Sequence, residues 1–162
     1  MIRLLAGLLL ATVTLTGCAT DQSETLVGWA SEVGLPQVIE DTSSAIGKVA
    51  GDLKSVGSDS DGIRTMVNVL RASGPALATQ AEALAAERAS NNAAYETLRS
   101  SVVDAMRSYA QAAAALDAEA VIASGDLRTV TEVVNALTSV STELTALNAF
   151  IEAHGTDPTG AA

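Results

Sequence analysis

Three kinds of residue are scarce in this sequence of 162 residues: cysteine, histidine and the aromatic residues. The single cysteine has no partner for an intramolecular disulfide, so the chain is not a secreted domain held together by disulfides. One cysteine and one histidine also cannot supply the ligands of a structural zinc site or a copper site. Aromatic residues make up only 2% of the chain, which argues against a sugar site or a drug-like pocket with aromatic walls.

Basic residues are also few, and the balance of charge is strongly acidic. The chain has nine Lys and Arg against nineteen Asp and Glu, a formal net charge of −10 at pH 7. One of the nine is Arg3, so residues 18–162 carry eight basic and nineteen acidic residues, a net charge of −11. This charge argues against binding to nucleic acid or to anionic lipid headgroups, and it favours solubility or a basic partner.

The first seventeen residues have the pattern of a secretion signal. Arg3 supplies a short positive region, and residues 4–15 form an apolar stretch that is too short to span a bilayer as a helix. The stretch ends in Leu15-Thr16-Gly17-Cys18. This segment resembles the lipobox of bacterial lipoproteins, in which a leucine and two small residues precede an invariant cysteine. The resemblance implies cleavage between Gly17 and Cys18, diacylglycerol on the Cys18 thiol, and acylation of the new amino group, as by palmitate.

The same resemblance implies a location. Each buried methylene contributes about 0.8 kcal/mol, so an anchor of three acyl chains would hold the protein on a membrane permanently. Ala19 stands where an aspartate usually retains lipoproteins in the inner membrane. The lipobox therefore implies a protein of the cell envelope, in the outer membrane and facing the periplasm if the organism is diderm. The expected domains are a signal peptide (1–17), a lipidated tether (18–24), a helical bundle domain (25–154) and a flexible tail (155–162).

Beyond the tether, apolar residues recur at intervals of three and four, the pattern of amphipathic helices, with no strand-like alternation of any length. Glycine, proline and capping residues divide this pattern into segments. The phase survives across Gly74-Pro75, which predicts one kinked helix there. The expected elements are a turn around Trp29 ending at Gly34, a helix from Pro36 to Gly57, a kinked helix carrying Ile63 to Leu84, a helix carrying Tyr95 to Leu116 and stopping at Gly125, and a last helix from an N-cap at Asp126 to about His154.

The lengths of these segments indicate the architecture. The three longest would have roughly 28 to 32 residues each and measure about 42 to 48 Å. Four rods of similar length joined by short loops predict an all-α fold, an antiparallel up-and-down four-helix bundle with a short extra N-terminal helix. The heptad phase also survives across Ser90 to Asn92, so one long helix from Pro75 to Ala123 is the alternative. Arg88 and Asn91 would lie on the seam of that long helix, which favours the bundle.

The polar residues form no recognisable catalytic or metal-binding motif. His154 is two residues from Glu152, so the Glu-x-x-His spacing of di-iron bundles is missing, and we expect His154 to be a residue of a helix C-terminus. Asp59 and Asp61 lie in a glycine-containing segment, but an EF-hand register there lacks the first ligand and the bidentate glutamate. We therefore expect Asp59 and Asp61 to be a helix cap and a loop charge.

Tyr95 and Tyr109 are fourteen residues apart on one helical face, and we expect them in the core rather than around a small site. The sequence thus predicts no catalytic residue, no metal and no cofactor. The predicted protein is a lipid-anchored, acidic envelope protein, not an enzyme, that acts as an interaction, scaffold or complex-assembly module with a protein partner. The alternative is a module that binds a small apolar or lipidic ligand between its helices.

Overall fold

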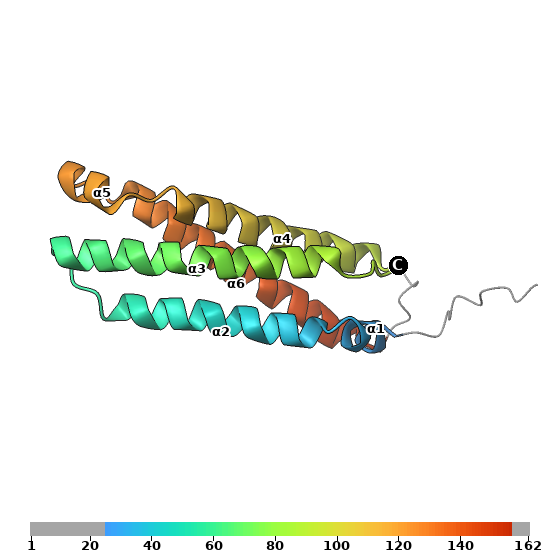
Figure 1. The fold of residues 1–162 in the computed structure, drawn as a ribbon. Helices are drawn as coiled ribbons and strands as arrows, with labels where there is room; N and C mark the ends of the chain where they lie inside the picture. The colour runs from blue at the N-terminus through green and yellow to red at the C-terminus, as the bar shows by residue number, and fades with distance from the viewer. Residues whose placement is uncertain (1–24, 157–162) are drawn as a thin grey trace, which may run out of the picture.

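The computed structural model describes residues 25–156, and this part of the chain is all-α, which confirms the predicted fold class at that level. No helix within residues 25–156 is both long and apolar enough to cross a membrane. The helices in the described range are α1 (Leu26–Glu32), α2 (Leu35–Lys54), α3 (Ser60–Ala86), α4 (Ala93–Ala114), α5 (Ala118–Ser124) and α6 (Arg128–His154), drawn in Figure 1.

The four long helices α2, α3, α4 and α6 lie side by side (Figure 1). α3 packs against α2 and α4, while α6 packs against α4 and α2. The α2–α3 connection and α5 lie at one end of the molecule, and α1 and the α3–α4 connection lie at the other (Figure 1). At that second end the Val27 amide donates a hydrogen bond to the carbonyl oxygen of Gly155, 2.9 Å away, which joins α1 to the end of α6.

Side chains cap four of these helices at their first turns. Each cap accepts a hydrogen bond from a backbone N–H that would otherwise have no partner within its helix. The capping residues are Thr25, Asp59, Asn92 and Asp117. α2 begins differently, after Gly34, whose φ of 75° is a left-handed conformation that glycine adopts without steric cost. Pro36 lies in the first turn of α2, as predicted.

α3 passes through Pro75 without interruption, so the prediction of one helix across this proline is confirmed, while the predicted kink stays a prediction. Pro75 has no N–H, and the carbonyl of Arg71 therefore lacks its usual helical partner. Gly74 lies directly against α4, because a Cβ atom at this position would be only 3.5 Å from the carbonyl oxygen of Ala110. Small side chains thus let α3 and α4 approach closely around the proline.

The predicted break at Ser90 to Asn92 is confirmed, and the alternative of one long helix from Pro75 to Ala123 is wrong. Polar side chains replace the helical hydrogen bonds in this connection. The Asn92 side chain accepts a hydrogen bond from the Tyr95 amide at 3.0 Å, and the Ser90 hydroxyl accepts one from the Asn92 amide at 3.2 Å. Side chains therefore satisfy two backbone donors where the chain leaves α3 and starts α4.

The prediction that the Tyr95 helix continues to Gly125 is wrong, because α4 ends at Ala114 and α5 is a separate helix. Leu116 keeps the apolar pattern in phase and is buried, but it lies beyond the end of α4. Asp117 then starts a new helix by accepting hydrogen bonds from the amides of the next turn at 2.9 and 3.1 Å. α5 packs against α3 as a result.

Two further helix ends differ slightly from the prediction. α2 ends at Lys54 rather than at Gly57, and the N-cap of α6 is Leu127 rather than Asp126. Asp126 still acts close to the start of α6, because its carboxylate accepts a hydrogen bond from the Arg128 amide at 2.9 Å. The C-terminal end of α6 at His154 is as predicted.

The core lies between the long helices, and α2 contributes less to it than the others. Buried side chains recur along α3, α4 and α6 at helical spacing, whereas α2 buries only Leu35, Thr42 and Val49. These three residues are spaced by seven, so α2 is attached to the rest of the molecule by a single narrow row. The largest fully buried side chains are Trp29, Tyr95 and Tyr109.

Candidate functional site

The residues predicted to carry the lipid and the cleavage site, Gly17 and Cys18, lie outside residues 25–156, the range that the structure describes. The signal peptide and the tether therefore stay predictions, as does the tail from residue 157 onward. Gly155 and residue 156 lie inside the described range. Gly155 is buried and accepts the hydrogen bond from α1 described above, so it is part of the packed structure.

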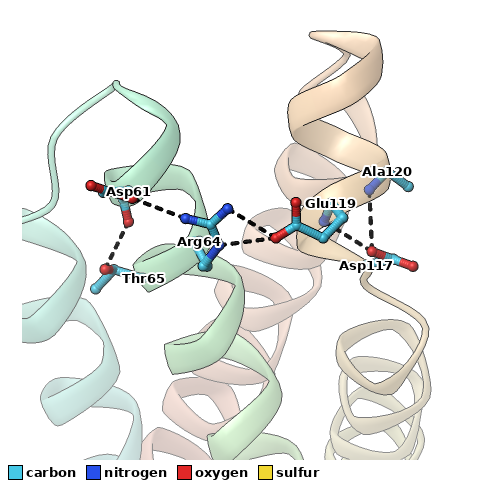
Figure 2. A network of polar contacts seen from close by, with 6 residues as sticks. All are labelled: Asp61, Arg64, Thr65, Asp117, Glu119 and Ala120. Atoms are coloured by element: carbon cyan, nitrogen blue, oxygen red, sulfur yellow. Dashed lines mark hydrogen bonds and ion pairs between the residues drawn. The ribbon is translucent and has the colours of Figure 1, made fainter.

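Asp59 is a helix cap, as predicted, but the prediction of a loop charge at Asp61 is wrong, because Asp61 lies in the first turn of α3. Asp59 accepts a hydrogen bond from the Gly62 amide at 2.8 Å, and Asp61 pairs with Nη1 of Arg64 at 2.9 Å. Arg64 also donates from Nε and Nη2 to Oε1 of Glu119, at 3.0 and 2.9 Å (Figure 2). The hydrogen bond to Glu119 and the charge of that residue raise the pKa of Arg64. This network joins α5 to α3.

His154 lies in the last turn of α6, as predicted for a residue of a helix C-terminus. Its ring is tilted against that of Phe150, with centroids 4.6 Å apart. Glu152 accepts a hydrogen bond from the side-chain amide of Asn148 at 2.8 Å. Within residues 25–156, no three His, Cys, Asp or Glu side chains are grouped closely enough to hold a metal ion.

Tyr95 and Tyr109 both lie in the core, as predicted, but their hydroxyl groups have different surroundings. The Tyr109 hydroxyl is 3.1 Å from the Leu70 carbonyl oxygen and 2.5 Å from the Ser73 hydroxyl, and burial raises the pKa of Tyr109. The Tyr95 ring packs edge-on against Trp29, with centroids 4.7 Å apart. The Tyr95 hydroxyl and the indole N–H of Trp29 are covered, and neither has a hydrogen-bond partner within the described residues.

The carboxylate of Glu87, the residue directly after the end of α3, is also covered and unpaired within the described residues. Both oxygens of Glu87 are covered, and neither has a hydrogen-bond partner within residues 25–156. Arg99 does not bind them: its Nη1 donates to the main-chain carbonyl of Glu87 at 3.1 Å, and its Nη2 pairs with Oε2 of Glu96 at 2.5 Å. The other oxygen of Glu96 accepts a hydrogen bond from the Ser90 amide at 2.7 Å. We name the following residues the Glu87 corner: Trp29, Glu87, Tyr95, Glu96 and Arg99.

Burial dominates the electrostatics of the Glu87 corner. It raises the pKa of Glu87 from its ordinary value of 4.5 to about 7; the positive charge of Arg99 opposes this rise, and the negative charge of Glu96 adds to it. Burial also raises the pKa of Tyr95, and the charge of Glu87 adds to that shift. Glu87 therefore gains or loses a proton near neutral pH, whereas ordinary glutamates stay ionised there.

Two grooves run along α2, one on each side of its narrow buried row. The groove between α2 and α3 has a volume of about 530 Å³, and the groove between α2 and α6 has a volume of about 330 Å³. Small and apolar side chains form much of both. The α2–α3 groove includes Ala45, Val49, Val69, Ala72, Ser73 and Ala76. The α2–α6 groove includes Ile39, Ser43, Ile46, Gly47, Leu144 and Asn148.

Neither Glu87 nor the grooves were predicted from the sequence. The burial of the Glu87 carboxylate arises only in the folded chain, where the charge of Glu87 also acts on Tyr95. One local signal was available: Glu87 is an acidic residue at the C-terminal end of a helix, where the helix dipole disfavours negative charge. No protein-family model, no curated protein and no solved structure matches this chain.

Proposed function

We propose that this chain is a lipid-anchored, acidic helical protein of the cell envelope that acts as an interaction, scaffold or complex-assembly module and is not an enzyme. Residues 1–17 would direct export, and Cys18 would carry the lipids. Residues 18–24 would then tether the helical domain to the membrane, which in a diderm organism is the outer membrane on its periplasmic side. The lipobox-like segment before Cys18 supports this location.

We further propose that α2, α3, α4 and α6 form an antiparallel up-and-down four-helix bundle, with α1 as the short extra N-terminal helix. The alternation of chain connections between the two ends of the molecule supports this topology (Figure 1). α5 then belongs to the connection between the third and fourth helices. In such a bundle α2 is the helix with the narrowest buried row, so its two flanks are the most open part of the surface.

The observation that carries the proposed interaction role is the pair of grooves beside α2. They offer recesses for the side chains of a protein partner on both sides of one helix. Two further recesses, of about 250 and 340 Å³, lie beside α5 and between α3 and α4. Most acidic residues within 25–156 are exposed, so the surface around the grooves favours a partner with basic residues. An apolar centre with a polar rim is the usual arrangement of a specific protein interface, and Lys48 and Asp52 border the α2–α3 groove.

Site-specific photo-crosslinking in intact cells tests the interaction role. A photoreactive residue would replace Ser43 in the α2–α6 groove or Ala72 in the α2–α3 groove, with Ser100 on the outside of α4 as the control position. At native expression we expect a discrete crosslinked species from at least one groove position and none from Ser100. Recovery of monomer alone from every position, with several crosslinking chemistries, would contradict the proposal.

The volume of the α2–α3 groove favours a second candidate function, the binding of a small apolar or lipidic ligand. Its volume of about 530 Å³ is within the range of roughly 300 to 1,000 Å³ that is usual for small-molecule sites. Ala76→Phe would fill this groove, and Ala149→Phe on the exposed side of α6 is the matched control. If a ligand binds there, native mass spectrometry should detect a co-purified molecule that only Ala76→Phe removes. No bound molecule, and no thermal shift of the wild type with lipids, would exclude this function.

A further inference from the structure

The C-terminal half of α2, residues 43–54, is weakly attached to the rest of the molecule. Val49 is the one buried residue of this segment. An equally long stretch of α3, residues 67–78, buries Val67, Leu70, Gly74 and Leu77. Because burial of apolar side chains is the main source of stability, residues 43–54 have much less to hold them in place.

Two glycines weaken the same segment further. Gly47 and Gly51 lie inside α2, and a Cβ atom at either position would meet nothing within 4 Å. Packing therefore does not require glycine at either position. Glycine inside a helix is less stable than alanine because it loses more backbone freedom on folding. Few buried side chains and a weak helix are the properties of a region that opens locally.

The chain is held more firmly on both sides of this segment. Before it, the hydroxyl of the buried Thr42 lies 2.7 Å from the Val38 carbonyl oxygen and 3.3 Å from Oε1 of Gln80 on α3. After it, Gly57 lies directly against the first turn of α3, since a Cβ on Gly62 would be 2.0 Å from the Gly57 carbonyl oxygen. These contacts confine the opening to residues 43–54.

The segment also forms one wall of the α2–α3 groove, which is apolar along most of its length and polar at one end. The polar end is the one nearest the α2–α3 connection, with Asp52, Thr65 and Asn68. Small and apolar side chains continue from there to the other end, namely Val49, Val69, Ala72, Ala45 and Ala76. This arrangement suits a ligand with one unbranched apolar chain and a polar head group.

We propose that residues 43–54 form a flap, which opens to admit a single-chain amphiphile of the fatty-acid type to the α2–α3 groove and closes over its chain. The same segment lines the α2–α6 groove through Ser43, Ile46 and Gly47, so its opening joins the two grooves. The flap gates entry, because the groove loses its α2 wall only in the open state. This gating rests on the second candidate function, the binding of a small apolar or lipidic ligand.

Native-state hydrogen exchange of the full chain tests the flap without any ligand. We expect the amides of residues 43–54 to be less protected than those of residues 39–42 and of the middle of α3. Gly51 lines neither groove, and Gly51→Ala should raise protection across residues 43–54 by about four- to fivefold through helix propensity alone. Thr142→Ala, the same kind of change at an exposed position of α6, should leave that protection unchanged.

Stopped-flow binding of cis-parinaric acid, an unbranched fluorescent fatty acid, tests the gating in the full chain. Ala76→Phe fills the α2–α3 groove, so the part of the signal that it removes measures binding there. If entry requires the open state, Gly51→Ala should slow association by the same factor, about four- to fivefold. Thr142→Ala should associate at the rate of the wild type.

The two experiments separate failure of the flap from failure of the ligand function. Protection of residues 43–54 equal to that of residues 39–42 would overturn the flap, as would a gain in Gly51→Ala spread evenly over all helices. An unchanged association rate in Gly51→Ala would overturn the gating and leave the ligand function standing. A fatty-acid signal that Ala76→Phe does not reduce would overturn the ligand function and the gating together, while the exchange data still decide the flap.

Discussion

Gly62 and Gly47 both lie in helices, but Gly62 has close neighbours and Gly47 has open space around it. A Cβ on Gly62 would lie 2.0 Å from the carbonyl oxygen of Gly57, so the whole α2–α3 turn would have to move. A Cβ on Gly47 would meet nothing within 4 Å. We predict that Gly62→Ala lowers the free energy of unfolding by about 1–3 kcal/mol, whereas Gly47→Ala raises it by about 0.5–1 kcal/mol. Urea unfolding of the two variants measures both values, and equal effects would contradict the close contact at Gly62.

The two buried tyrosines give a second contrast at the residue scale. Tyr109→Phe removes the hydroxyl that contacts Leu70 and Ser73, and we predict a loss of about 1–2 kcal/mol. Tyr95→Phe removes a hydroxyl that has no hydrogen-bond partner within the described residues, so stability should stay unchanged or rise. Thermal unfolding of both variants at the same pH compares them. A larger loss from Tyr95→Phe would show that its hydroxyl has a partner.

α2 is the long helix held by the narrowest buried row, and this has a consequence for dynamics. Its core contacts come from Leu35, Thr42 and Val49, and the Thr42 hydroxyl lies 2.7 Å from the Val38 carbonyl and 3.3 Å from Gln80. We predict that the free energy of the opening that allows hydrogen exchange is smaller for α2 amides than for amides in the middle of α3, α4 and α6. Native-state hydrogen exchange measures this order directly. Protection in α2 equal to that in α3 would contradict the weaker attachment of α2 to the core.

α3 provides a test of how a helix tolerates proline. Because α3 is continuous through Pro75, Pro75→Ala restores an N–H for the Arg71 carbonyl without changing the path of the chain. We predict that stability is unchanged or increased, as measured by urea unfolding. A loss above about 2 kcal/mol would show that the proline ring is needed where α3 meets α4.

Helix positions were predictable where local chemistry decides them, and less so where packing does. Asn92 and Ser90 mark the end of α3 with side chains that replace backbone hydrogen bonds, and this break was predicted. The break before α5 was not, because Leu116 continues the apolar pattern while Asp117 caps a new helix. The raised pKa of Glu87 was beyond sequence analysis, since the burial that causes it arises only in the folded chain.

At the scale of the whole molecule, charge and the proposed anchor act together. The net charge of −11 over residues 18–162 repels anionic headgroups, so the helical domain would stand away from the membrane on its tether. The grooves beside α2 would then stay accessible to a basic partner in the surrounding compartment. The proposed role in the envelope therefore depends first on whether Cys18 carries lipid.

Fatty-acid labelling of intact cells that express the wild type or Cys18→Ser tests this most directly. We predict that the wild type is labelled, is cut before Cys18 and partitions into detergent. Cys18→Ser should be unlabelled and keep the size of the precursor, because a hydroxyl cannot form the thioether that the lipoprotein signal peptidase requires. The helical domain of both should fold, since residues 25–156 pack without Cys18. A wild-type protein that is unlabelled and freely soluble would contradict the lipid anchor and, with it, the proposed location.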